Sequence, residues 1–164
     1  MTASIMPTLA FAVMSGMMCP SDPEAEKSEQ VAIDHSISVI CDDGETYERR
    51  ADAIKSLADY AKLTDAQLES LHGVFGAERT FEQLLLFRPL GRLGNEDSLR
   101  LLLAQQTRWK WYKYTLTLNA AIYSLSKRLD IDVWDQLHPF YRKLWTDQRL
   151  VRPTGRKLES IESP

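Results

Sequence analysis

The sequence predicts a mainly α-helical, single-domain protein, built as a bundle around one long central helix with at most one or two short strands. The first indication is residues 98–129, which contain no proline, glycine, aspartate or glutamate. The second is the recurrence of apolar residues three and four positions apart on both sides of this run. The third is the length of 164 residues with 44% hydrophobic content, which suits one domain with a substantial core.

Residues 1–30 are predicted to be a flexible or partner-docked N-terminal segment. Residues 1–21 carry no charged side chain, and Pro7 and Gly16 interrupt the apolar run, which is too short to span a membrane. The segment also lacks the basic start of a signal peptide. We therefore expect a cytoplasmic protein without membrane contact, with a helical domain over residues 31–148 and a basic flexible tail over residues 149–164.

The first regular elements after this segment are a strand and a helix. Ile37, Val39 and Cys41 alternate with polar residues, which predicts a strand over residues 36–41 that ends in a turn at Gly44. Apolar residues then recur at helical spacing, which predicts a helix over residues 46–62.

Two short helices should follow. Thr64 and Gln67 form a capping-box pattern that opens a helix closed near Gly76. The pattern repeats at residues 80–83 and predicts a third helix over residues 81–88, which Pro89 should stop. Together these two helices superficially resemble a helix-turn-helix, but the second is mostly apolar and acidic and so is poorly suited to reading bases.

The long helix is predicted over residues 95–129, with Asn95 as its cap. A seam of apolar residues at seven-residue spacing must be buried, and it consists of Ala104, Trp111, Leu118 and Leu125. At 1.5 Å per residue the helix would be roughly 50 Å long, so a break near residues 115–117 is an alternative. After a cap at Asp132, a last helix should cover residues 133–147, kinked or split by Pro139.

Charge is unevenly distributed along the chain. Residues 1–97 hold 8 Lys and Arg against 17 Asp and Glu, whereas residues 98–157 hold 12 against 4. Such an asymmetry is typical of a protein with a basic working surface for an acidic partner, most often nucleic acid. The alternative is that the acidic half packs beside the basic half within the fold.

The predicted binding site combines cations with aromatic rings. Cations neutralise phosphates and exposed rings stack on unpaired bases, a mixture that suits single strands or RNA. The alternative is that the rings belong to the core and the lysine stems lie over them. The candidate nucleic-acid-binding residues are Arg108, Trp109, Lys110, Tyr112, Lys113, Arg142, Lys143, Arg149 and Arg152.

The sequence offers little chemistry for catalysis. The three histidines and two cysteines show no spacing typical of zinc ligands, and no phosphate-binding glycine loop is present. Cys41 as a nucleophile is a minor alternative to Cys41 as an ordinary thiol. We therefore expect a protein that is not an enzyme, with no cofactor and no metal.

Two functions remain for such a protein. The first is a small accessory protein that binds single-stranded nucleic acid or RNA through its basic C-terminal half, as a subunit of a nucleoprotein complex. The second is a protein–protein adaptor or inhibitor that uses its acidic N-terminal half and makes no nucleic-acid contact. A protein partner is expected in both.

Overall fold

Helices dominate the structure, a computed structural model that describes residues 23–76, 79–108 and 112–158. The predicted helical class is thereby confirmed. The α-helices of the described residues are α1 (Pro23–Cys41), α2 (Tyr47–Ser56), α3 (Asp65–Gly73), α4 (Thr80–Leu93), α5 (Glu96–Ala104), α6 (Tyr112–Leu129) and α7 (Pro139–Asp147). Single 3-10 turns are η1 (Leu57–Asp59), η2 (Val74–Gly76), η3 (Gln105–Thr107) and η4 (Trp134–Gln136), and the strands are β1 (Ile131–Asp132) and β2 (Arg156–Lys157).

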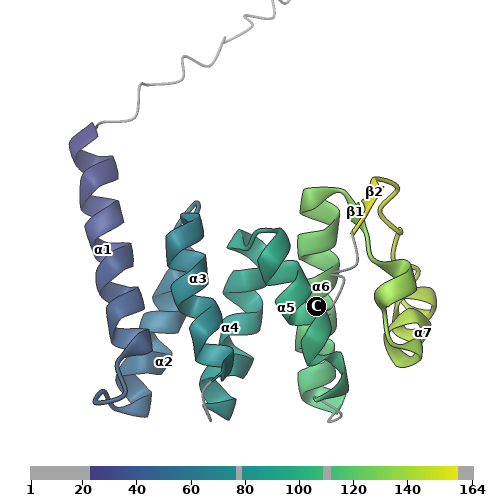
Figure 1. Cartoon of the computed structure of the whole chain (residues 1–164), viewed down its shortest axis with the longest axis horizontal. Coiled ribbons are helices and arrows are strands. Elements are labelled where there is room, and N and C mark those ends of the chain that lie inside the picture. Colours follow the sequence, from purple (N-terminus) through teal and green to yellow (C-terminus); the bar gives the residue numbers. More distant parts are fainter. Residues whose placement is uncertain (1–22, 77–78, 109–111, 159–164) are drawn as a thin grey trace, which may run out of the picture.

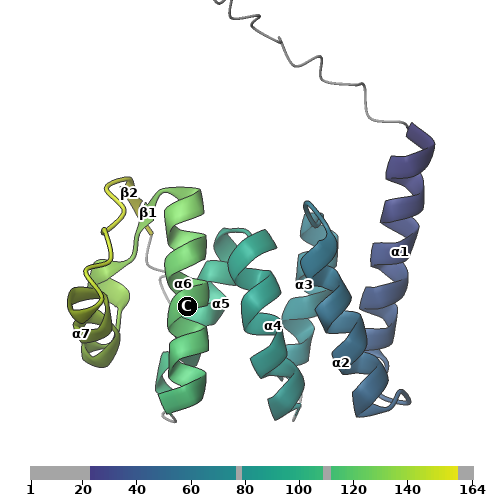
Figure 2. The ribbon, with the colours of Figure 1, turned by 180° about the vertical axis from the view of Figure 1, so that it is seen from behind.

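The helices form a row of hairpins in two layers (Figure 1). Helices α1, α3 and α5 pack on one another in order, and we call them the odd layer. Helices α2, α4 and α6 pack on one another in the same order and form the even layer, which faces the viewer in Figure 2. The row ends with α7 and the two short strands, which lie beyond α6 (Figure 1).

The single long helix predicted over residues 95–129 is not present. Instead, α5 ends at Ala104, η3 follows, and α6 begins at Tyr112 and packs back against α5. The buried Gln106 marks this break, because its side-chain amide donates to the carbonyls of Leu103 at 3.0 Å and Gln136 at 3.2 Å. Folding back lets both halves bury their apolar faces, which one straight helix of this length would leave partly in water.

The strand predicted over residues 36–41 is wrong, since these residues form the last turns of α1. Ile33, Ile37 and Ile40 are all buried at helical spacing, a pattern that the alternation at residues 37, 39 and 41 obscured. The hydroxyl of Ser36 donates to the carbonyl of Ala32 at 3.0 Å, within the helix. The short strands lie near the C-terminus instead, where Ile131 pairs in parallel with Arg156.

Pro89 does not end α4, contrary to prediction, and the helix continues to Leu93. A proline inside a helix costs about 3 kcal/mol through a lost hydrogen bond and a steric clash. Here the residues after it are buried, with Leu90 fully inaccessible and Leu93 only 8% exposed. Their burial offsets the cost. The predicted cap at Thr80 is also wrong, because the cap position is Arg79.

Three predicted helix boundaries are confirmed. Thr64 and Gln67 form the capping box of α3. Asn95 caps α5, with Ser98 completing a second box. Pro139 splits the predicted last helix into η4 and α7, and the His138 side chain accepts from the amide of Phe140 at the start of α7.

Residues 149–158 of the predicted basic tail lie against the body of the protein. Pro153 and Leu158 are buried, and β2 pairs with β1. Arg152 donates through Nε to Asp132 at 2.8 Å, and Arg156 forms an ion pair with Glu96. None of the helices in the described ranges is long and apolar enough to cross a bilayer.

A close helix contact lies between α4 and α6. A Cβ atom built on Gly91 would stand 2.6 Å from Cα and 2.9 Å from Cβ of Ala121. Only a residue without a side chain therefore allows the two backbones to approach this closely.

We predict that Gly91→Ala destabilises the fold by about 1–3 kcal/mol, because the new methyl group must push α4 and α6 apart. Chemical denaturation followed by circular dichroism measures the change. The matched control is Gly73→Ala, where a Cβ meets nothing within 4 Å and α3 should gain stability of up to about 1 kcal/mol. Equal stability of the Gly91 variant and wild type would refute the close approach.

Candidate binding groove between two helices

The two layers differ in charge. The odd layer carries eight acidic residues against two basic ones, Lys27 and Arg100. The acidic residues are Glu24, Glu26, Glu29, Asp34, Asp65, Glu69, Glu96 and Asp97. The even layer carries three acidic residues against eight basic ones, which are Arg49, Arg50, Lys55, Arg88, Arg92, Lys113, Lys127 and Arg128. Charge in the helices is thus sorted by layer.

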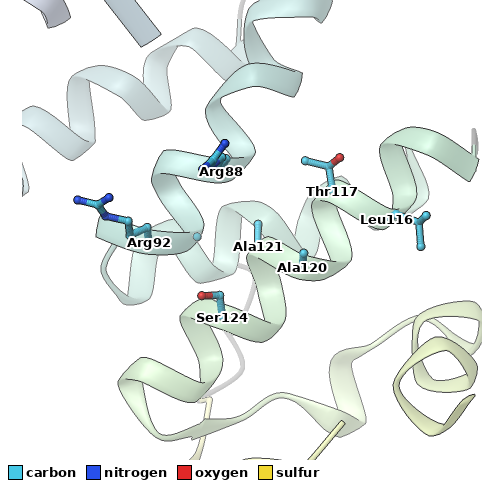
Figure 3. A pocket seen from close by; sticks show the side chains of 8 residues that line it. Arg88, Arg92, Leu116, Thr117, Ala120, Ala121 and Ser124 are labelled. Carbon is cyan, nitrogen blue, oxygen red and sulfur yellow. The ribbon is translucent and has the colours of Figure 1, made fainter. Parts of the chain in front are cut away.

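A groove of about 560 Å³ lies on the even layer between α4 and α6. Figure 3 shows its two walls, with the arginines on α4 and the small residues on α6. We call it the α4–α6 groove, and its lining consists of Arg88, Gly91, Arg92, Leu116, Thr117, Ala120, Ala121 and Ser124. No residue of this lining is acidic, and most side chains are small.

The two arginines give the groove a positive rim. Both are exposed and lie four residues apart on α4, so they point to the same side of the helix. Arg92 donates to the carbonyls of Ala58 and Tyr60, which fix its position without cancelling its charge. Arg88 has no carboxylate within ion-pair distance among the described residues.

The predicted site residues around position 110 lie near the start of α6. Trp109 and Lys110 fall outside the described residues. Tyr112 and Lys113 form the first turn of α6, whereas Arg108 is exposed at the end of η3, its amide bonded to Gln105. Position 113 thus lies in the first turn of α6 in the even layer, and position 108 lies at the end of η3.

The predicted site residues of the C-terminal region are mostly engaged within the protein. Arg142 donates to the carbonyls of Leu137 at 2.9 Å and Asp135 at 2.7 Å. Lys143 pairs with Asp147 on its own helix at 2.6 Å.

Arg149 and Arg152 complete this set. Arg152 bonds the Asp132 carboxylate through two nitrogens and lies 5.5 Å from the centre of the Trp134 ring. Arg152 also holds the pKa of Asp132 below its ordinary value. Arg149 is exposed, with a backbone φ of 52° in the turn after α7.

The described aromatic residues of the second half are largely core. Trp145 and Tyr141 are each 1% exposed, and Trp145 donates through its indole nitrogen to Asn119 at 2.7 Å. Burial raises the pKa of Tyr141 to about 12. Tyr123 packs edge-on against Trp145, with ring centroids 5.1 Å apart. These rings hold α7 on α6 and are not offered to a ligand.

Sequence reasoning missed the groove, because the helix over residues 81–88 was predicted to stop at Pro89. The missed residues are Arg88, Gly91 and Arg92. A signal was present, since Leu86, Leu90 and Leu93 continue a helical apolar spacing through Pro89. Following that spacing would have put both arginines one turn apart on a helix.

A second, acidic pocket of about 530 Å³ lies on the odd layer between α3 and α5. Its lining is Asp65, Glu69, His72, Asn95 and Asp97. His72 Nε2 lies 2.8 Å from the hydroxyl of Ser98, and Asn95 donates to Asp65. Within the described residues, no group of three histidines, cysteines or carboxylates is arranged to hold a metal ion.

Cys41 has the environment of an ordinary thiol. Its Sγ lies 3.5 Å from the Ser70 carbonyl, to which it donates. Partial burial raises the pKa of this thiol, although the nearby Arg79 acts in the opposite direction. The reactive thiolate is therefore disfavoured.

The chain matches no protein-family model, and neither the search of curated proteins nor the search of solved structures finds a match.

We predict that protonation of His72 lowers the stability of the fold when the pH falls below about 6.5, which is the pKa of a histidine in the unfolded chain. Burial lowers the pKa of His72, opposed in part by Asp97 and Glu69. The contribution of neutral His72 to stability is complete above the pKa that this residue has in the unfolded state. It decreases as the pH falls towards the lower pKa of the folded state. Urea denaturation of wild type and His72→Gln at pH 5 and pH 7.5 measures it. Wild type should lose more stability than the variant over this interval, and an equal loss would refute the assignment.

Proposed function

We propose that the protein is a non-enzymatic interaction module that binds an acidic helical segment of a protein in the α4–α6 groove. The observation that carries the proposal is a groove with a small-residue floor, two arginines on one rim and no carboxylate in its lining. Small residues allow a helix to approach closely, and the arginines favour an acidic occupant. This differs from the adaptor expected from sequence, which would have used the acidic half.

The direction of the groove also suits a helix. Its floor is formed by two parallel neighbours of one layer, so it runs along helices rather than into the core (Figure 3). Amphipathic helices that dock into such grooves present anchors at positions i, i+3, i+4 and i+7. The occupant would thus place small apolar residues over Ala120 and Ala121 and carboxylates beside Arg88.

Fluorescence anisotropy tests the proposal with a labelled, stapled helical peptide that has alanines on one face and glutamates one turn apart. The full chain should bind it, and Arg88→Glu should weaken binding about five- to tenfold by turning one attraction into a repulsion. Ala120→Trp should weaken it more than about tenfold by filling the floor.

The matched control for Arg88→Glu is Lys62→Glu, which makes the same charge change at an exposed residue outside the groove lining. It should leave the affinity unchanged. A peptide with glutamine in place of glutamate should bind more weakly. No binding by wild type, or the same affinity in all variants, would refute the proposal.

A second candidate function is the binding of single-stranded nucleic acid or RNA, as an accessory protein. It is favoured by the basic excess of the even layer, which includes Lys113, and by Arg108, which precedes the ring-rich residues 109–112 in the sequence. Against it, Arg142, Lys143 and Arg152 already have partners within the protein. The protein-binding proposal is therefore preferred.

A salt titration with a labelled single-stranded RNA tests this second candidate. Affinity should fall steeply with salt, and Arg108→Ala or Lys113→Ala should each reduce the slope of log K against log salt by about one. Lys143→Ala, which removes a lysine already paired with Asp147, is the control that should change little. Absence of binding at low salt would exclude nucleic acid.

A further inference from the structure

The N-terminal turns of α1 project from the row of helices. In Figures 1 and 2, these turns extend beyond the ends of α2 and α3. The lower turns of the same helix are anchored in the core by Ile33, Ile37 and Ile40. We call residues 24–32 the α1 tip. A rigid helix whose base is buried thus presents its tip to the surroundings.

The α1 tip has the chemistry that the α4–α6 groove would take. The tip carries three carboxylates, Glu24, Glu26 and Glu29, and one cation, Lys27. Neither Glu26 nor Glu29 forms an ion pair with any described residue. Val31 is 63% exposed and adds apolar contact area to the tip.

The spacing of the tip residues matches the groove. Ser28 and Ala32 are both exposed and four residues apart, so they form a small-residue stripe along the tip. Glu29 follows Ser28 directly and borders this stripe, whereas Glu26 lies two residues before Ser28 and points to another side of the helix. Arg88 and Arg92 are likewise one turn apart on α4, beside the small residues Ala120 and Ala121. The Glu29 carboxylate can therefore meet the Arg88 guanidinium while the small-residue surfaces touch.

The tip cannot reach the groove of its own chain. Its base is packed on α2 and α3, whereas the groove lies farther along the row between α4 and α6. Opposite charge on different surfaces of one molecule instead permits contact between two copies. Such a contact is heterologous, because the donor and acceptor surfaces differ, and each added copy offers a new tip and a new groove.

We propose that the α1 tip of one copy docks into the α4–α6 groove of a second copy, so that the protein self-associates head to tail. This inference rests on the proposed function and names a second copy of the chain as an occupant of that groove. The tip of one copy then occupies the groove of the next. An acidic helix of another protein would need the same groove, so it competes with self-association.

Sedimentation velocity of the full chain over a range of concentrations tests the proposal. The average mass should rise above the 18.8 kDa of one chain at low salt and return towards it at high salt, since exposed charge pairs are screened. Arg88→Glu removes the groove contact, and Glu29→Arg removes the tip contact. Each variant alone should remain monomeric, whereas the controls Lys62→Glu and Glu48→Arg should associate like wild type.

Mixing the two variants gives the decisive result. The Arg88 variant keeps a working tip and the Glu29 variant keeps a working groove, so an equimolar mixture should recover association. The two substituted surfaces also carry opposite charges, so complexes larger than a dimer are expected. Unchanged circular dichroism and melting of each variant confirm that the fold is intact. A monomeric mixture, or association that persists in either single variant, would overturn the head-to-tail contact.

The stapled peptide separates this inference from the proposed function. If wild type remains monomeric at every concentration but binds the peptide, self-association is wrong and the groove still takes an acidic helix from another protein. If wild type is monomeric and also fails to bind the peptide, the groove itself is not a docking site and both proposals fall.

Discussion

The close approach of α4 and α6 is the constraint on which the rest of the structure depends. Gly91 lets the two backbones meet at Ala121, and this pair forms the most extensive helix contact within the described residues. A wider separation would open the core between Leu90 and Ile122, and it would also remove the floor of the α4–α6 groove. Stability and the candidate site therefore share one contact, and neither can change without the other.

The remaining helices are held in register by polar groups that cross from one hairpin to the next. Arg50 on α2 donates to Glu82 on α4 at 2.8 Å and also to the carbonyl of Glu45 in the preceding turn. Arg79 donates to the Ile40 carbonyl at 2.7 Å, at the C-terminal end of α1, where a cation complements the helix dipole. A buried ion pair adds little net stability but is costly to break. Such contacts select one stacking order among apolar surfaces that could otherwise slide.

Local signals in the sequence predicted local structure well, and failures arose where packing between distant segments decides. The capping box at Thr64 and the cap at Asn95 were found because they act within one turn. The helix at Pro89 was missed because its cost is offset by burial against α6, which is remote in sequence. The groove was missed for the same reason. The break after Ala104 carries no proline or glycine and depends on Gln106 bonding to η4.

The charge pattern has a different meaning in the fold than along the chain. Successive helices alternate between layers, so a comparison of the two sequence halves mixes acidic and basic faces. The basic excess after residue 98 is partly neutralised inside the C-terminal region, by Asp132 with Arg152 and by Asp135 with Lys157. What remains for a partner is the face of the even layer, where Arg88 stands beside a floor without carboxylates. Because an electrostatic field steers a partner before contact, an acidic helix should approach this face.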